Sequence, residues 1–252
     1  MLTDADRKRY RALQDKKARG MAKRFLVQGR KVVAELLGSR FRTELVLATP
    51  EAAAFIGPLA ERAKVRVEVQ PAHELDKIGT FEKGNELIAI AVEPENSAFR
   101  VPGAAELMLA LDGVRDPRNL GSLYRIADWF GITRLLLSHD CMESYNPKVV
   151  QSTMGSLFRV DARRVSMGSE LAALREQGVH VFIADMDGVS VYQAELSRPA
   201  VLVLGSESHG HSRAVNELGA QVLSIPRLGG AESLNVAMAA AALCTEFSRR
   251  IL

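Results

Sequence analysis

The chain of 252 residues predicts a two-part α/β protein, and its larger, C-terminal part is expected to be a mostly parallel sheet covered by helices. After about residue 103, strand-like runs alternate with helical patterns, and these runs are apolar almost throughout, as in parallel sheets that are covered on both faces. A polar loop with two prolines, residues 93–102, separates this region from a smaller α/β segment. We therefore predict domains over residues 1–97 and 103–252.

In the N-terminal part, the apolar pattern predicts a short strand, a turn at Gly29 and an amphipathic helix that ends at Gly38. The expected strands that follow are 44–48, 65–69 and 87–92, and the expected helices are 51–62 and 72–78.

The C-terminal part alternates strand and helix patterns to its end. Ligands of such sheets bind beyond the carboxyl ends of the strands, so the turns after Leu111, Leu137, Leu204 and Ile225 are the expected place of a site. The alternating segments are 107–111, 120–130, 134–137, 147–155, 169–177, 179–184, 201–204, 213–218, 222–225 and 234–250.

Composition excludes several classes of protein. No apolar run approaches the roughly 20 residues of a spanning helix, and the polar N-terminus lacks the apolar stretch of a secretory signal, so we expect no membrane segment and a cytoplasmic location. Cys141 and Cys244 lie far apart without a partner motif. This argues against a disulfide framework or a Cys-rich zinc site and favours two small buried residues in a reducing compartment.

The net charge of +3 is distributed unevenly. Residues 1–31 hold eleven Lys and Arg against three Asp, a net charge of +8, so the remainder carries −5. This layout is typical of a chain whose N-terminal end binds a polyanion, although a solvated basic helix would have the same composition. The candidate contacts with such a polyanion are Lys16, Lys17, Lys23 and Arg24.

The first informative loop follows the strand at 107–111 and leads into a helix with Asn119 as its expected cap. Arg125 lies two positions, or about 200° of helical rotation, beyond Leu123, so its guanidinium is predicted to point away from the core, toward a phosphate or a partner chain. A solvated charge is the simpler interpretation. The predicted buried stripe is Leu120, Leu123, Ala127 and Phe130, with Gly131 as the stop.

The second loop, residues 203–211, places Gly205 and Gly210 around Glu207 just after an apolar strand. The glycines allow close approach of backbone to a ligand, whereas the simpler role of Glu207 is to bind the loop's own amides. His209 and His211 lack further ligands at the usual spacing, so we expect no zinc site.

The third loop, residues 225–235, leads into an alanine-rich helix that can pack closely against its neighbours. Ser233 is its expected cap. Asn235 is a poor helix former, so its place in the first turn needs a hydrogen-bonding explanation. No GxGxxG motif follows any strand, which argues against an ordinary Rossmann nucleotide site.

Together the three loops resemble the SPOUT-class RNA methyltransferases, specifically the SpoU or TrmH family of RNA ribose 2′-O-methyltransferases. The N-terminal part is similar, more weakly, to this family's RNA-binding extension, a small α/β domain like certain ribosomal proteins. The motifs occur in order across residues 105–250 and are Asp116-Pro-Arg-Asn-Leu-Gly121 with Arg125 and Phe130-Gly131, Gly205-x-Glu207-x-x-Gly210, and Ile225-Pro226 with Ser233-Leu-Asn-Val236.

The resemblance implies a deep trefoil knot in the C-terminal part that holds S-adenosylmethionine. The absence of further ligands near the two histidines leads us to expect no metal. Knots are otherwise almost absent from proteins. The resemblance also implies a homodimer in which the helix with Arg125 lies near the partner's cofactor pocket, where this arginine binds phosphate and polarises the acceptor hydroxyl. Tyr124 and Trp129 flank Arg125 and are candidates for stacking on a base, although the core or the dimer interface is the more favoured place for Trp129.

The resemblance also implies which residues form the site. The positions that support Arg125 in catalysis are Asn119, Glu207, Ser233 and Asn235. The expected cofactor contacts are Leu204, Gly205, Ser206, Glu207, Ile225, Pro226, Leu228, Leu234 and Thr153.

Three functions stay open from the sequence. The first is S-adenosylmethionine-dependent methylation of a ribose 2′-oxygen in rRNA or tRNA, the second a non-catalytic RNA-binding protein of the same fold, and the third a knotted methyltransferase that acts on an RNA base. The intact motif residues Arg125, Glu207, Ser233 and Asn235 favour an enzyme over a binding protein.

Overall fold

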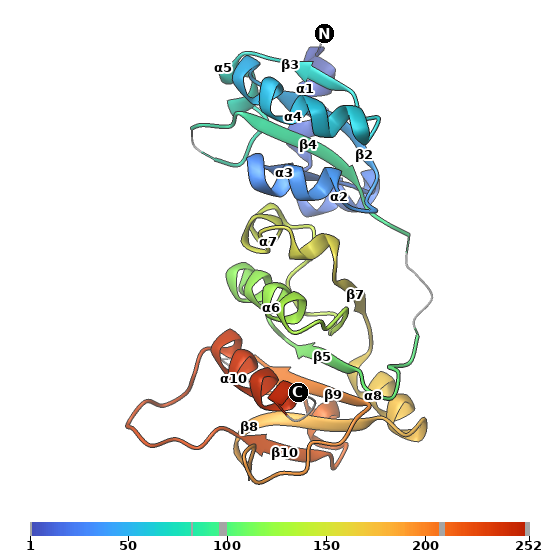
Figure 1. The fold of residues 1–252 in the computed structure, drawn as a ribbon, viewed down its shortest axis with the longest axis vertical. Helices are drawn as coiled ribbons and strands as arrows, with labels where there is room; N and C mark the ends of the chain where they lie inside the picture. Colours follow the sequence, from blue (N-terminus) through green and yellow to red (C-terminus); the bar gives the residue numbers. More distant parts are fainter. Residues whose placement is uncertain (1, 82, 96–99, 207–209, 250–252) are drawn as a thin grey trace. The chain divides into compact units, whose positions relative to one another are not determined.

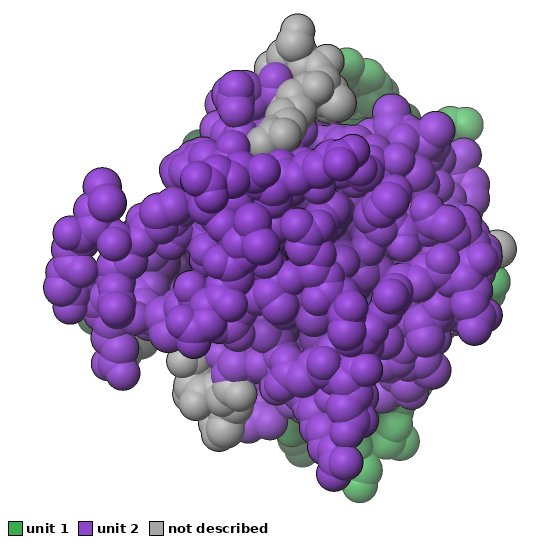
Figure 2. All heavy atoms as spheres, turned by 90° about the horizontal axis from the view of Figure 1, so that it is seen from below, with its two compact units in different colours: residues 1–97, 143–159 green, residues 98–142, 160–252 purple. Residues whose placement is uncertain are grey.

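The computed structural model describes residues 2–81, 83–95, 100–206 and 210–249, and it divides into two compact units (Figure 1, Figure 2). Unit 1 comprises residues 1–97 and 143–159, and unit 2 comprises residues 98–142 and 160–252. The units differ from the domains predicted at 1–97 and 103–252 in the segment 143–159, which belongs to unit 1. The predicted boundaries themselves stay a prediction.

Unit 1 is built on a four-stranded sheet in the order β1-β4-β2-β3. Strand β4 runs antiparallel to β1 and β2, and β2 runs parallel to β3. The strands are β1 (Arg24–Gln28), β2 (Thr43–Ala48), β3 (Val67–Val69) and β4 (Leu87–Val92). The helices are α1 (Asp4–Ala12), α2 (Lys16–Ala22), α3 (Arg30–Leu37), α4 (Pro50–Arg62) and α5 (Ala72–Asp76). The elements predicted from residue 24 onward are confirmed, with small shifts at their ends.

The period of two along the strands determines which side chains form one core of unit 1, since alternate residues point to the same face. Helices α1 and α5 contribute apolar residues to that face. The cluster contains Leu2, Tyr10, Leu13, Leu26, Leu45, Leu47, Leu75, Ile78, Ile88 and Ile90.

The apolar pattern does not predict α1 and α2, and polar caps define where they begin. The Thr3 hydroxyl accepts a hydrogen bond from the Asp6 amide, while the Asp6 carboxylate accepts one from the Thr3 amide. In the same way, the Asp15 carboxylate accepts from the amides of Lys17 and Ala18. These caps satisfy backbone donors that a helix leaves without partners in its first turn.

A buried ion pair holds the segment 143–159 within unit 1. The Arg19 side chain is almost fully buried, and it donates to the two carboxylate oxygens of Glu143 at 2.9 and 2.8 Å. It also donates to the backbone carbonyls of Leu13 and Gln14 at 2.8 Å. The guanidinium is therefore well satisfied, which a buried charge requires.

Aromatic contacts reinforce this arrangement around helix α7 (Pro147–Ser152) and the 3-10 turn η1 (Ser156–Phe158). The rings of Tyr145 and Phe25 stack with their centroids 4.5 Å apart. Phe158 meets Phe41 edge-on at 5.2 Å. A segment that lies in the sequence between two strands of unit 2 therefore belongs to the core of unit 1.

Unit 2 is a six-stranded sheet in the order β10-β8-β9-β5-β6-β7, and every pairing between these strands is parallel. This confirms the predicted parallel sheet. The strands are β5 (Leu107–Asp112), β6 (Arg134–Leu137), β7 (Asp161–Arg164), β8 (His180–Ser190), β9 (Ala200–Gly205) and β10 (Gln221–Ser224). The helices are α6 (Pro117–Trp129), α8 (Met167–Glu176), α9 (Arg213–Asn216) and α10 (Val236–Arg249). The apolar pattern does not predict β7, whose sequence is Asp-Ala-Arg-Arg. The knot expected from the family resemblance stays a prediction.

The sheet of unit 2 buries both faces, as its nearly continuous apolar strands predict. Helices α6 and α10 pack together over one face (Figure 1), where the ring of Phe247 meets that of Phe182 at 5.4 Å. The other face packs against α8 and α9. That second core contains Met108, Ala110, Leu136, Val165, Met167, Leu171, Leu174, Val179, Val181, Ile183, Val201, Val203 and Val215.

Both cysteines carry buried free thiols, which confirms the prediction for Cys141 and Cys244. Burial raises the pKa of the Cys244 thiol to about 12, so this side chain stays protonated and apolar at neutral pH. None of the helices in the described ranges has the length and apolar composition that a bilayer crossing requires.

The Arg19–Glu143 pair gives a direct test of the two-unit division. Replacing Glu143 with Gln should lower the free energy of unfolding by about 1–2 kcal/mol, because the buried guanidinium loses an ionised partner. Urea unfolding followed by circular dichroism measures this loss. The exposed Glu95 serves as the control, and Glu95→Gln should leave stability unchanged. Equal stability of both variants would reject the structural role of the pair.

Candidate functional site

The carboxyl ends of β5 and β9 lie side by side, with Asp112 opposite Gly205 in the pairing register. The buried Asp112 carboxylate accepts a hydrogen bond of 2.6 Å from the Ser212 amide, and so fixes the end of the loop that follows β9. A Cβ at Gly205 would lie 2.8 Å from the Gly210 carbonyl oxygen, so only glycine fits there. The motif residue Glu207 lies outside the described residues.

The loop after β5 is held to the end of β6 by a short polar chain. The Ser138 hydroxyl donates to Asp140 at 2.5 Å and accepts from the Gly113 amide, while Arg115 pairs with Asp140 at 3.1 Å. The hydrogen bond from Ser138, together with Arg115, lowers the pKa of the Asp140 carboxyl below its ordinary value. Asp140 therefore stays ionised at neutral pH and anchors Arg115 in the loop that precedes α6.

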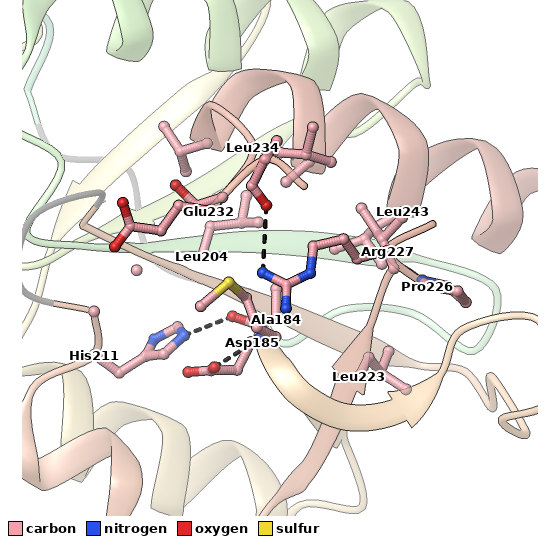
Figure 3. A pocket seen from close by; sticks show the side chains of 18 of the residues that line it. Ala184, Asp185, Leu204, His211, Leu223, Pro226, Arg227, Glu232, Leu234 and Leu243 are labelled. Carbon is pink, nitrogen blue, oxygen red and sulfur yellow. Dashed lines mark hydrogen bonds between the residues drawn. The ribbon is translucent and has the colours of Figure 1, made fainter. Parts of the chain in front are cut away.

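A pocket of about 510 Å³ opens at this edge of the sheet, between the middle of β8, the ends of β9 and β10, and the loop that leads into α10 (Figure 3). Its apolar base includes Ala184, Leu204, Leu223 and Leu243. The lining residues that the sequence predicts as cofactor contacts are Leu204, Gly205, Ser206, Ile225, Pro226, Leu228 and Leu234. Parallel packing thus brings the second and third motifs into one cavity, as expected for such sheets.

Ser233, predicted as a supporting catalytic residue, also lines the pocket. The sequence patterns do not assign Asp185, Met186, Arg227 or Glu232 to the site, and they point to His211 only as a candidate zinc ligand, although all five side chains line the pocket. Apolar periodicity does not predict such residues, because a side chain on a cavity wall need not follow the period of a helix or a strand.

Thr153 is not among the residues that line the pocket. It belongs to unit 1, is fully buried, and donates its hydroxyl hydrogen to the Val150 carbonyl at 2.8 Å. The hydroxyl is therefore occupied within its own helical turn, and the site described below leaves Thr153 out.

Helix α6 begins with Asp116, which corrects the expectation that Asn119 is its cap. The Asp116 carboxylate accepts from the amides of Arg118 and Asn119 at 2.9 and 2.8 Å, and Pro117 fills the first helical position. Proline fits there because its missing N–H would have no partner in any case. Asn119 is thereby placed inside the first turn.

Arg125 is exposed on α6, as its spacing from Leu123 predicts. It does not line the pocket of its own chain, and no hydrogen bond or ion pair joins it to another side chain in the part of the chain that is described. The predicted buried residues Leu120, Leu123 and Ala127 are buried, while Phe130 is only half-buried.

The aromatic neighbours of Arg125 behave differently from each other. Tyr124 has no exposed surface, so the expectation that it stacks on a base is wrong: it lies on the buried face, one position from Leu123. Trp129 is 84% exposed, which excludes the core as its place, while its place at a dimer interface or against a base stays a prediction.

A side-chain hydrogen bond joins two predicted site residues. Asn235 Nδ2 donates to Asn119 Oδ1 at 3.0 Å, while Asn235 Oδ1 accepts from the Ala237 amide at 2.9 Å. Helix α10 therefore begins at Val236 with Asn235 as its cap, and the expectation that Ser233 caps it is wrong. These two hydrogen bonds explain why an asparagine, a poor helix former, stands at this position. They also connect the start of α10 to α6.

Within the described residues, no group of three or more His, Cys, Asp or Glu side chains is arranged to hold a metal ion.

Comparison with known proteins identifies the family. Residues 106–245 match the model of the SpoU rRNA methylase family, and residues 7–89 match the MRM3-like substrate binding domain. The chain belongs to the SpoU rRNA methylase family. This confirms the resemblance read from the three loops. Among relatives, the 23S rRNA (guanosine(2553)-2′-O)-methyltransferase RlmP of Bacillus subtilis is 29% identical over 94% of this chain and 93% of its own length.

Further members of the SpoU family extend the comparison. The 23S rRNA (guanosine-2′-O-)-methyltransferase RlmB of Bordetella pertussis is 32% identical over 76% of this chain and 81% of its own length. A solved structure of a TrmH-family protein from Porphyromonas gingivalis is 37% identical, with a TM-score of 0.89 over 99% of both chains. The SpoU methyltransferase AviRb from Streptomyces viridochromogenes, solved in complex with AdoMet, is 27% identical, with a TM-score of 0.89 over 99% of this chain and 98% of its own.

The double role of Asn235 predicts a graded loss of stability. Asn235→Ala should lower the free energy of unfolding by about 1–2 kcal/mol, since it removes both the cap and the bond to Asn119. Asn235→Asp keeps an oxygen that accepts from the Ala237 amide, so it should lower the free energy of unfolding by less. Chemical denaturation measures both, and Ser233→Ala is the control that should stay within about 0.5 kcal/mol of the parent. A larger loss for Ser233→Ala than for Asn235→Ala would restore Ser233 as the cap.

Proposed function

We propose that this chain transfers a methyl group from S-adenosylmethionine to a ribose 2′-oxygen of ribosomal RNA in the cytoplasm. The observation that carries the proposal is the pocket beyond the ends of β9 and β10, where the second and third family motifs converge beside the helix start that holds Asn119. The names of the relatives, which are 23S rRNA 2′-O-methyltransferases, support ribosomal RNA as the substrate.

The pocket fits the proposed cofactor in size and character. Its volume of about 510 Å³ lies in the range of small-molecule sites, and its base is apolar while its rim carries charged side chains. Backbone around Leu204, Ile225 and Leu234 would hold the adenosine. The absence of a side chain at Gly205 lets the Gly210 backbone pack against the end of β9 at the edge of this pocket. S-adenosylmethionine, when bound, supplies a methyl group activated by its sulfonium. AviRb, a structural neighbour of 27% identity, was solved with AdoMet.

Arg125 is the side chain that we assign to the acceptor RNA. Its guanidinium is exposed and permanently charged, and it presents donors that can bind a phosphate while polarising the neighbouring hydroxyl. Holding the ribose oxygen in line with the methyl group lowers the entropic part of the barrier. Asn119, Ser233, Asn235 and Glu207 would support this arrangement, as the family resemblance implies.

Arg125 does not line the pocket of its own chain, so we propose a homodimer in which it serves the pocket of the partner subunit. Two exposed apolar side chains support an interface formed by α6 and α10. Trp129 is 84% exposed and Met238 is 66% exposed. These helices pack against each other, so burying both side chains against a second copy would remove apolar surface from water.

Unit 1 is the part that we assign to RNA binding. It carries 20 Lys and Arg against 15 Asp and Glu, a net charge of +5, whereas unit 2 carries 13 against 15, a net charge of −2. Lys16 and Lys17 are exposed in the first turn of α2, where the helix dipole disfavours positive charge. These two lysines therefore do not stabilise the helix, and their positions are better explained by binding to a polyanion. The match of residues 7–89 to a substrate binding domain supports this assignment.

Lys23 and Arg24 differ in how far they are available to RNA. The Lys23 side chain is 67% exposed, and its ammonium lies 3.8 Å from Glu93. Arg24 is half-buried, pairs with Glu44 and donates to the Ala22 carbonyl, so part of its role is structural.

Replacing Arg125 should reduce catalysis without changing the stability of the fold. Arg125→Ala should reduce methyl transfer to ribosomal RNA by on the order of 100-fold or more, because a preorganised charge at the acceptor is lost. Cofactor affinity by calorimetry and the unfolding transition should stay unchanged, since the side chain is exposed. Arg213→Ala, on the exposed surface of α9, is the matched control. A cooperative loss of stability in Arg125→Ala would make the residue structural.

The dimer proposal is tested by mixing two inactive variants. Arg125→Ala keeps the pocket, and Ala231→Trp keeps Arg125 but obstructs the pocket, since Ala231 is an exposed lining residue. Co-refolded mixtures should regain about a quarter of wild-type activity, as random pairing in a two-fold dimer gives one intact shared site in each mixed dimer. No recovery would reject a site shared between subunits.

Neutralising the exposed lysines should weaken RNA binding in a salt-dependent way. The triple change Lys16→Gln, Lys17→Gln and Lys23→Gln should reduce the slope of log affinity against log salt by about 2, as loss of three phosphate contacts to single strands predicts. Filter binding at several salt concentrations measures the slope. Arg24→Gln should mainly reduce stability, because Arg24 is already paired. An unchanged slope in the triple variant would remove α2 from the RNA interface.

A further inference from the structure

The charged side chains that line the pocket include more carboxylates than guanidinium groups. Among the described residues that line it, Asp185 and Glu232 are acidic and Arg227 is the one with a permanent positive charge. All three are exposed, and they lie above a base of aliphatic side chains. Figure 3 shows the Arg227 guanidinium directed into the pocket.

Arg227 makes little use of its hydrogen-bonding capacity within the chain. It donates one bond of 3.3 Å to the Ala231 carbonyl of its own loop, and no carboxylate pairs with it in the described structure. Other arginines of unit 2 differ, since Arg134 pairs with Glu106 and Arg213 pairs with Glu217. A guanidinium has five N–H donors, so most of those on Arg227 are left for a ligand.

The charges of the rim mirror those of the proposed cofactor. At its amino-acid end S-adenosylmethionine carries one negative group, the carboxylate, and two positive groups, the ammonium and the sulfonium. The rim offers one guanidinium and two carboxylates. The planar fork of an arginine matches a carboxylate with two parallel hydrogen bonds, which gives geometric specificity as well as attraction.

We infer that Arg227 binds the carboxylate of the cofactor's amino-acid end and so distinguishes S-adenosylmethionine from nucleosides that lack this group. The inference rests on the proposed function, because it takes the pocket as the cofactor site. Asp185 and Glu232 provide the part of the rim that suits the cationic groups. An RNA phosphate is the competing ligand for the same guanidinium.

The test is a binding cycle on the protein without RNA. Calorimetry compares S-adenosylmethionine with decarboxylated S-adenosylmethionine, which lacks only the carboxylate, in the parent chain and in Arg227→Gln. We expect Arg227→Gln to weaken S-adenosylmethionine by about 10-fold, as loss of a charge-assisted hydrogen bond predicts, and to leave the decarboxylated ligand unchanged. Arg227→Lys, which keeps the charge but not the fork, should lie in between, and Arg213→Gln is the surface control.

Each other outcome overturns the inference in a distinct way. If Arg227→Gln lowers the affinity for both ligands equally, Arg227 only shapes the pocket. Unchanged affinity for both, with a raised KM for RNA, would assign the guanidinium to an RNA phosphate. A parent chain that binds neither ligand would refute the proposed function itself, whereas a parent chain that binds both equally well would refute only the role of Arg227.

Discussion

The parallel pairing of β5 with β9 is the constraint on which the site depends. These strands are about 90 residues apart in sequence, yet their pairing places Asp112 opposite Gly205 and brings the loops that follow them to one edge of the sheet. The hydrogen bond from the Ser212 amide to Asp112 then fixes the second loop against the end of the first strand. Because Asp112 is buried, this bond is shielded from water, and the loop geometry follows from the sheet rather than from the loop sequence alone.

The helices that cover this edge are joined by polar contacts at their starts. Asp116 caps α6, Asn235 caps α10, and Asn235 also donates to Asn119. A residue that is both a cap and a cross-helix donor cannot be exchanged for a better helix former without losing one of the two bonds. This explains an asparagine in a segment otherwise rich in alanine, and it couples the position of the Arg125 helix to the mouth of the pocket.

The sequence predicts the elements far better than it predicts their ends or the walls of the site. Apolar periodicity correctly predicts the strands of both sheets except β7, and it predicts most of the buried face of α6, because burial imposes that period. The choice of polar residues near each helix start predicts the wrong caps, Asn119 and Ser233. Several polar residues precede each helix, and only the backbone conformation decides which side chain reaches an amide. Apolar periodicity gives no signal for α1, α2 or β7, where few apolar residues are present. Asp185 and Arg227 lie between motif positions, so only the folded pocket reveals them.

The segment 143–159 interleaves the two units along the sequence. Its chain neighbours are strands β6 and β7 of unit 2, but its buried contacts, Glu143 with Arg19 and Tyr145 with Phe25, belong to unit 1. Three chain crossings therefore join the units, at residues 97–98, 142–143 and 159–160, where a simple N-terminal extension would have one. Removing residues 1–97 would leave a carboxylate and two aromatic rings without their partners. The basic unit is thus built partly from a segment that lies in sequence within unit 2, which opposes separating the two units by truncation.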